Sequence, residues 1–563
     1  MECRSRVSDG PTARRPGSSI EGRNRRPDES PRERARLALL IWTLLGLLPC
    51  TVDAGEPVFI GKVTIKTVDV FAPEEVKSFL NKGANALHVI TLDSTVRRFL
   101  IFEEGDVYDP AVLAEAERNL RALGLFRSVS IVAGDVHDGV VDVEVNTQDA
   151  WTVQIGLSAG SGGGAMRGGI ALGEKNILGL ATQLRVAFAK DEDRTYRSVE
   201  ILTPNFFLPF TTAHVLYGNN SDGSEKVLEI LRPFYSTAAP WSAELAYADT
   251  RRDEFLYEEG GAVQSTFGAD HFRFLASYGV ALSAKEGNAS RLSIGLDLRD
   301  DRFRTASTGE TPVNPLPADR RFRYVFMQYE ALHSDFLKWN YVNHDERYED
   351  IGVGPQLKLR LGISPAVLGV AETTGIVGAE VGAGFRAGTS GYVQARVAWD
   401  SRVGQQLENS LLGATVLYVR RFQTALLQTF VAQIAALRGW NLDEDKQIFL
   451  DAQAGLRAYN LRAFEGDTRI ILNLEHRIFS GSQWFGLTSP GLAVFFDAGL
   501  VGGGPTQSLR LSDVKMDAGL GLRLAMTWAP VMNVFRIDAG YAFQRDPTGH
   551  KGWLISFSTG QAF

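Results

Sequence analysis

A serine flanked by glycines is the first group that could do chemistry. The stretch Gly156-Leu157-Ser158-Ala159-Gly160 matches the Gly-x-Ser-x-Gly pattern of a nucleophile elbow. That pattern activates its serine only on a sharp strand-to-helix turn, with an acid and a histidine supplied later in the chain. Here a glycine-rich stretch and another strand-like segment follow, so the setting of a hydrolase is missing. We therefore predict that the chain is not an enzyme.

Three neighbouring acids, Asp443, Glu444 and Asp445, are the next candidates, because a carboxylate cluster could bind a cation. The run lacks the glycine that an EF-hand calcium loop needs, and a solvated loop is the simpler interpretation. Neither His-Glu-x-x-His nor Gly-x-x-x-x-Gly-Lys occurs, so zinc-peptidase and P-loop chemistry lack support. We predict no metal site and no cofactor.

The other chemistry-bearing side chains are acids and arginines set among apolar residues. Glu475 and Arg477 alternate with aliphatic residues between 469 and 479, and Asp497 does the same between 493 and 500. A period of two predicts strands, and here one strand face is apolar while the other carries charge. These charged residues need a sheet whose polar face is wet.

Composition limits which protein classes could supply that sheet. The 563 residues are 44% hydrophobic and 22% charged, and aromatic residues are plentiful, which excludes a disordered or collagen-like chain. The mean hydropathy is -0.08, and no apolar run reaches the roughly 18 residues of a membrane-spanning helix. The mildly acidic balance, a formal net charge of -7, makes nucleic acid an unexpected partner.

An export signal is predicted at residues 1–54. The apolar stretch Leu37–Leu48 follows an arginine-rich segment and precedes small residues, which is the order of a secretory signal with a long basic region. A buried helix is the alternative. Both cysteines, Cys3 and Cys50, fall within this segment, so the exported chain would carry no thiol.

Residues 55–149 predict a small α+β domain. Asp109 and Pro110 are a good N-cap and first helical residue. The helix that follows has one apolar stripe, formed by Leu113, Ala116, Leu120 and Leu123. Two strands come next, joined at the turn Asp138-Gly139. The helices would cover one face of the sheet.

This order of elements resembles a POTRA domain, the periplasmic module of BamA-type outer-membrane proteins. The stretches Phe102–Pro110 and Leu123–Val129 carry the resemblance, and one copy fits here. An unrelated small α+β domain is the alternative for this stretch taken alone. The resemblance implies a sheet edge that accepts an extended polypeptide client as an added strand.

From residue 150 to residue 563 the sequence predicts an all-β transmembrane antiparallel barrel. Segment after segment alternates, many are ten or more residues long, and five follow residue 467. A soluble sandwich, with the apolar face as its core, is the alternative. The length of the segments and the acids and arginines gathered on the polar face, as in a wet lumen, favour the barrel. Our tally is 16 to 20 segments, and we predict 16 strands. Closure follows because lipid cannot satisfy an open sheet edge.

A motif near the C-terminus makes the resemblance to the BamA superfamily specific. Arg457-Ala458-Tyr459, followed by Gly466, resembles the loop-six motif, which usually reads Arg-Gly-Phe or Arg-Gly-Tyr. Ala458 departs from that pattern. Arg462 begins a second near-match that lies too close to Gly466, and it is the runner-up.

The resemblance implies that a loop near residues 440–467 folds into the barrel lumen. In the family, the arginine of this loop pairs with lumen acids, which here correspond to Glu475 and Asp497. The alternation places both acids on the polar face independently. A guanidinium between two carboxylates would make charge-assisted bidentate bonds.

Both ends of the barrel carry further expectations. The chain end resembles the family's C-terminal assembly signal at Ser558, Gly560 and Phe563. The first strand, which should close the barrel against the last, is poor in side chains, and we expect a weakly specified seam there. The seam residues are Trp151, Gly156 and Gly160.

These expectations describe an outer-membrane protein that inserts or translocates polypeptides, with its POTRA domain in the periplasm. Its partners would be outer-membrane lipid and unfolded or extended polypeptide clients, and the resemblance also allows accessory periplasmic factors. The alternative is a dedicated export pore or a surface antigen without an assembly role. A passive porin fits less well, because a porin has no use for a POTRA domain.

Overall fold

A computed structural model describes residues 57–562, apart from 74–75, 77–81, 84, 87, 163–164, 286, 307–315, 344–347, 425, 485–487, 504–508, 527–533 and 560. The predicted export signal, residues 1–54, lies outside the described residues. Within the described part of the chain, no helix is long and apolar enough to cross a membrane.

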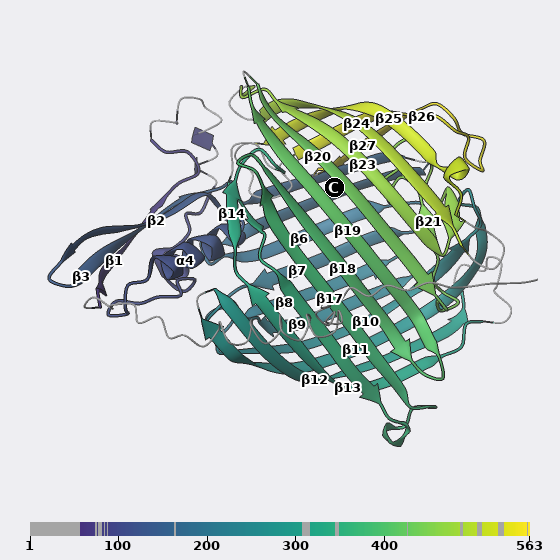
Figure 1. Cartoon of the computed structure of the whole chain (residues 1–563), viewed down its shortest axis with the longest axis horizontal. Coiled ribbons are helices and arrows are strands. Elements are labelled where there is room, and N and C mark those ends of the chain that lie inside the picture. Colours follow the sequence, from purple (N-terminus) through teal and green to yellow (C-terminus); the bar gives the residue numbers. More distant parts are fainter. Residues whose placement is uncertain are drawn as a thin grey trace, which may run out of the picture. The chain divides into compact units, whose positions relative to one another are not determined.

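The first part of the described chain is a three-stranded sheet with helices on one side (Figure 1). Its elements are β1 (Phe59–Val68), α3 (Asp93–Arg97), α4 (Pro110–Ala122), β2 (Phe126–His137) and β3 (Val140–Asp149). The central strand β3 pairs parallel with β1 and antiparallel with β2. The two outer strands are therefore the edges of this sheet.

Helix α4 forms as the sequence predicts. The Asp109 side chain accepts a hydrogen bond from the Ala111 N–H, and Pro110 occupies the first helical position. The apolar stripe is buried against the sheet at Leu113, Ala116 and Leu120, within a single apolar cluster. The α+β domain and its helix are confirmed.

The rest of the chain closes into one antiparallel barrel, in which β27 lies beside β4. Its strands are β4 (Val153–Gly162), β5 (Ala165–Ile177), β6 (Thr182–Lys190), β7 (Thr195–Thr203), β8 (Thr212–Asn220), β9 (Gly223–Arg232), β10 (Trp241–Tyr257), β11 (Val263–Lys285), β12 (Asn288–Thr305), β13 (Arg320–His333), β16 (Gln356–Ser364), β17 (Thr374–Ala387), β18 (Gly391–Val403), β19 (Leu407–Gln423), β20 (Leu427–Trp440), β23 (Thr468–Phe479), β24 (Thr488–Gly502), β25 (Lys515–Met526), β26 (Val534–Ala542) and β27 (Trp553–Thr559).

The barrel has twenty strands in the described part of the chain. This number lies within the tally of 16 to 20 segments but above the 16 strands that we predicted. The five strands expected after residue 467 are β23 to β27. Alternation fails as a counting rule farther upstream: four charged residues in a row, 299–302, belong to β12 and pair with both neighbouring strands.

The two faces of the barrel wall differ in polarity, as a membrane requires. Side chains that point outward are apolar and exposed, for example Ile294 and Leu520. Lumen-facing acids such as Glu475 and Asp497 are buried beneath other parts of the chain. Closure leaves no unpaired edge in lipid, which is why this alternating sheet forms a ring rather than an open layer.

Several short elements are not strands of the barrel. A hairpin of β14 (Phe336–Trp339) and β15 (Glu349–Gly352) interrupts the connection between β13 and β16. A second small pair, β21 (Ile448–Leu450) and β22 (Phe464–Gly466), lies between β20 and β23. Two single-turn helices, η1 (Ala366–Leu368) and η2 (Leu511–Asp513), complete the described elements.

Candidate functional site

The segment between β20 and β23, residues 441–467, packs into the lumen through its own apolar residues. Leu456, Ala458 and Tyr459 are fully buried in one cluster with Leu450 of the same segment and Ile471 of the barrel strand β23. This lumen loop is thus part of a packed interior rather than a surface connection.

The Asp451 carboxylate organises the turn of the lumen loop. One oxygen accepts hydrogen bonds from the Gln453 and Ala454 N–H groups, and the other accepts one from the Arg462 N–H at 2.8 Å. These bonds hold the backbone on both sides of Arg457. The guanidinium is therefore presented on a fixed turn.

Arg457 lies between the two acids that the sequence singles out. Its Nε and Nη2 donate to the two Asp497 oxygens at 2.7 and 2.8 Å, and its Nη1 donates to Glu475. The guanidinium also stacks over the Phe495 ring, 3.7 Å from its centroid. Bidentate geometry and stacking together fix its orientation, which a lysine could not reproduce.

The charged cluster is larger than sequence reasoning suggested. Glu475 also accepts from Arg477 at 2.8 Å and from Arg523 at 3.1 Å, and Arg523 donates to Asp538 at 2.6 Å. Alternation had placed each of these residues on a polar strand face. The alternation of the sequence could therefore have identified these residues as lumen-facing, but it does not indicate which charged side chains contact one another.

A third acid, Asp517, was missed entirely as a site residue. It is buried directly opposite Asp497 in the β24–β25 register, and one of its oxygens accepts the Ala458 N–H at 3.3 Å. Asp497 is held by Asn473 as well, at 2.8 Å. Two carboxylates facing each other repel, so Arg457 has an electrostatic task that one acid alone would not give it.

Ala458, which replaces the usual glycine of the family motif, is accommodated by a glycine on the barrel wall. A Cβ placed on Gly540 would lie 3.0 Å from the Ala458 Cβ. The hydroxyl of Tyr459 lies 2.8 Å from the Gln544 side-chain oxygen. At Gly466 in β22, a Cβ would meet Val501 at 2.8 Å, so this position needs a glycine for close approach to β24.

The runner-up arginine, Arg462, points elsewhere. It donates to Asp193 at 2.7 Å and lies over the Tyr257 ring, 3.5 Å from its centroid. It has no bond to Glu475 or Asp497 among the described contacts. The spacing argument that favours Arg457 agrees with this geometry.

The acidic run at 443–445 is not the solvated loop that we expected. Asp445 is only 8% exposed and pairs with Arg320 of β13 at 2.7 Å. Asp443 pairs with Arg402 of β18 at 2.5 Å. That interpretation was wrong for these two acids because lumen arginines far away in sequence meet the loop here.

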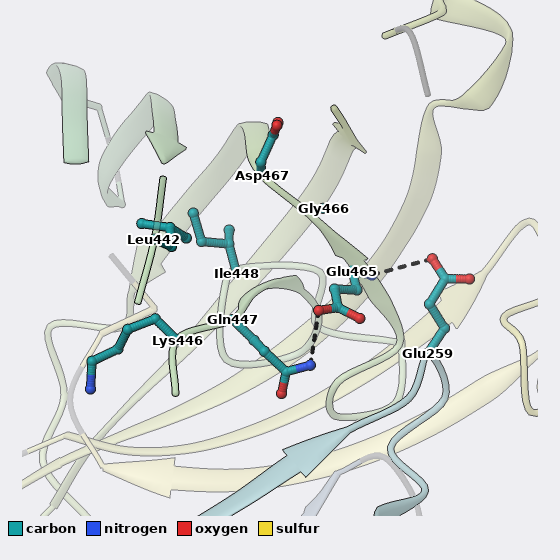
Figure 2. A pocket seen from close by; sticks show the side chains of 8 residues that line it. All are labelled: Glu259, Leu442, Lys446, Gln447, Ile448, Glu465, Gly466 and Asp467. Carbon is teal, nitrogen blue, oxygen red and sulfur yellow. Dashed lines mark hydrogen bonds between the residues drawn. The ribbon is translucent and has the colours of Figure 1, made fainter. Parts of the chain in front are cut away.

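A polar pocket of about 390 Å³ lies beside the base of the lumen loop (Figure 2). Gln447 donates to Glu465 at 2.8 Å, and the Glu465 N–H donates to Glu259 at 3.3 Å. In the part of the chain that the structure describes, no group of three or more potential ligands is arranged to hold a metal ion.

The remaining candidate residues lie at the seam. Gly156 and Gly160 are in β4, opposite Ala171 and Arg167 of β5. Trp151 lies two residues before the start of β4, and Ser158, the serine of the Gly-x-Ser-x-Gly pattern, is in the middle of that strand. The strand has no following helix, so the nucleophile elbow is absent. Ser558 lies in β27 opposite Arg536, whereas Gly560 and Phe563 lie outside the described residues.

Comparison with known proteins identifies the first domain. Residues 58–148 match the POTRA family model, described as a surface antigen variable number repeat. The BamA assembly factor of Neorickettsia risticii is 28% identical over 135 residues, which is 23% of this chain and only 18% of that protein.

Two solved structures align with most of this chain, and the alignments include most of their own chains, at low sequence identity. CdiB from Acinetobacter baumannii is 11% identical with a TM-score of 0.46, covering 94% of this chain and 97% of that one. BamA from Haemophilus ducreyi is 12% identical with a TM-score of 0.35, covering 90% of this chain and 85% of that one.

The class that the fold defines is a POTRA domain followed by a closed antiparallel barrel. Residues 58–148 therefore belong to the POTRA domain family, and this match covers less than a fifth of the chain.

Proposed function

We propose that this protein inserts or translocates polypeptides at the outer membrane, and that a client first binds as an added strand at the β2 edge of the POTRA sheet. The observation that carries the proposal is the difference between the two sheet edges. An extended polypeptide adds to a sheet through backbone hydrogen bonds, so it needs an edge whose N–H and C=O groups are accessible.

The β1 edge is already occupied by the chain itself. The Ile60 N–H donates to the Asp106 carbonyl and the Tyr108 N–H donates to the Val58 carbonyl, both at 2.8 Å. Residue 107 therefore lies beside β1 like a short extra strand. A client would have to displace this segment, which makes β1 the poorer edge.

The β2 edge has no strand beside it other than β3 within the described residues. On its outer side, the Ile131 N–H donates to the Glu117 carboxylate of α4 at 3.1 Å. Because N–H groups alternate along a strand, the Ala133 N–H also points outward, whereas the Val132 N–H points toward β3. A client strand would bond to these outward groups.

After capture, the client would pass through or beside the barrel at the seam of β4 and β27. β27 is seven residues long, the shortest barrel strand in the described part of the chain. Three of the ten residues of β4 are glycines, which carry no side chain. Short pairing with few side-chain contacts supports a seam that can open.

The test is a proline on the outward side of β2. Ala133→Pro removes an outward N–H without removing a bond to β3, and Ala133→Val keeps the N–H as the matched control. Each variant is tested in cells that depend on it. We expect fewer client cross-links to β2 and a changed outer-membrane proteome in Ala133→Pro, and neither change in Ala133→Val. A normal proteome with normal cross-links in Ala133→Pro would refute capture at this edge.

The same proteome distinguishes the modes of action. Loss of many barrels on depletion indicates general assembly, and loss of one protein indicates a dedicated exporter. Loss of none would point to a surface antigen or pore without an assembly role, and would contradict the proposal.

A further inference from the structure

The connection between β13 and β16 places a hairpin against the inner wall of the barrel. We call residues 334–343 and 348–355 together the mouth hairpin. Its strands β14 and β15 pair with each other and with no barrel strand. Its apolar residues form one cluster with residues of β18, β19 and β20, whose members are Leu337, Val342, Ile351, Val353, Tyr392, Val419 and Val431.

The contacted wall residues face the lumen. Val397 and Val416, which alternate out of phase with Tyr392 and Val419, are exposed on the lipid side. Tyr392 and Val419 are buried under the hairpin instead. The mouth hairpin therefore lies inside the ring, at the ends of the strands where the chain passes from β13 to β16.

Hydrogen bonds fix the mouth hairpin to the wall at several strands. The Gly384 N–H of β17 donates to the Val353 carbonyl at 3.0 Å, and the Gln394 amide of β18 donates to the Gly352 carbonyl at 2.6 Å. Arg477 of β23 donates to the Val342 carbonyl at 2.7 Å. Since Arg477 also holds Glu475, the hairpin is connected to the charged cluster around the lumen loop.

The other side of the mouth hairpin is held by helix α4 of the POTRA domain. Arg121 makes two bonds of 2.7 Å to the Asp350 carboxylate. Lys338 donates to Glu117 at 2.6 Å, and Arg118 lies over the Phe336 ring, 4.6 Å from its centroid. The hairpin thus bridges the POTRA helix and the barrel lumen.

Glu117 accepts from three groups: Arg121 of the same helix, Lys338 of the mouth hairpin and the Ile131 N–H of β2. The last two connect the mouth hairpin to the β2 edge. One oxygen accepts the Lys338 ammonium of the mouth hairpin, and the other accepts the outward Ile131 N–H of β2. A client strand added to β2 would place a backbone carbonyl at the Ile131 N–H, where the Glu117 carboxylate now lies. The carboxylate would then have to leave, and its bond to Lys338 would be strained or lost.

We propose that the mouth hairpin is a plug in the periplasmic end of the barrel, and that strand addition at β2 releases it through Glu117. The inference rests on the proposed function, because it needs a client at that edge. It adds a coupling that the capture step does not require: the groups that recognise the client also hold the lumen closed.

The experiment measures conductance of the full-length protein in planar lipid bilayers. Lys338→Met and Asp350→Asn each remove one ion pair between α4 and the mouth hairpin. We expect roughly a two- to fivefold rise in the fraction of time at high conductance, the size typical of a partly exposed ion pair. Arg396→Met is the matched control, because it removes a lumen ion pair with Glu380 that does not involve the hairpin.

The coupling is tested by adding a synthetic peptide of residues 553–563 as a model strand. We expect the peptide to raise the conductance of the wild type, and to have little further effect on Lys338→Met. Unchanged conductance in both Lys338→Met and Asp350→Asn would overturn the proposal that the mouth hairpin is a plug. If conductance rises in these variants but bound peptide does not change the conductance of the wild type, the coupling between strand addition at β2 and release of the plug is overturned.

These outcomes are separate from failure of the proposed function. Peptide binding to the POTRA edge is measured by cross-linking in the same bilayer samples, with Ala133→Pro as the non-binding variant. If the peptide fails to bind the wild type, the capture step at β2 is refuted and the coupling falls with it. If it binds normally and conductance does not change, only the coupling is refuted.

Discussion

Removing Arg457 should loosen the lumen loop and destabilise the barrel around it. In Arg457→Ala, Glu475 keeps two arginine partners, Arg477 and Arg523. Asp497, in contrast, keeps only the hydrogen bond from the Asn473 amide and loses both bonds from the Arg457 guanidinium. It would then face Asp517 across the strand pair without a compensating cation.

The size of the effect follows from this asymmetry. Breaking a buried ion pair by removing one partner costs about 3–5 kcal/mol, because the other charge stays buried. Here one of the two acids remains compensated, so we expect about 3 kcal/mol, and less where water fills the gap. Asp497→Asn should partly rescue Arg457→Ala, because it removes the repulsion with Asp517.

The assay is the temperature at which the barrel loses its compact, heat-modifiable form on gels, measured for each variant in the same detergent. Arg462→Ala is the control, since Arg462 pairs with the partly exposed Asp193 outside the cluster. A cysteine pair at positions 457 and 497 should also cross-link. The reasoning is refuted if Arg462→Ala shifts the temperature as much as Arg457→Ala, or if Asp497→Asn deepens the defect.

Four further outcomes are expected. The protein should fractionate with the outer membrane and migrate faster on gels before heating; mainly helical circular dichroism would contradict this. Gly540→Ala should displace the lumen loop, because its Cβ would crowd the Ala458 Cβ at 3.0 Å, and the double variant with Ala458→Gly should restore the wild-type melting temperature. Deletion of Phe563 should lower the amount of inserted barrel, and unchanged membrane levels would argue against an assembly signal. The pKa of Glu117 is lowered: burial opposes this, but the Lys338 bond and the Ile131 N–H outweigh it. The ionised Glu117 side chain therefore stabilises the contact between α4 and the mouth hairpin fully above the usual glutamate pKa of about 4.3, and this stabilisation is lost as pH falls through the lowered pKa. Protease cleavage of the mouth hairpin should rise only in that acidic range.

Local pattern was sufficient for the architecture. A cap at Asp109, a proline after it and an apolar stripe on one side of a helix are decided within a few residues. Dyad alternation likewise assigns each strand residue to lipid or lumen, because successive side chains point to opposite faces. The choice of Arg457 over Arg462 came from spacing within a motif, and the structure brings Arg457 to the two acids.

Alternation says which face a residue occupies, but not which strand lies beside it. The number of strands depended on long segments such as β12, where charges follow one another and the pattern fails. The pairing of Asp445 with Arg320 joins residues 125 positions apart, and no local rule relates them.

The same limit applies to Asp517 and to the mouth hairpin. Asp517 becomes part of the site only because the register of β24 and β25 sets it opposite Asp497. The mouth hairpin reads as an ordinary connection until its apolar face meets Tyr392 and Val419 inside the closed ring. The sequence determined which face of its strand each residue occupies. Ring closure and strand register determined which residues contact one another, because those contacts exist only after distant strands have paired.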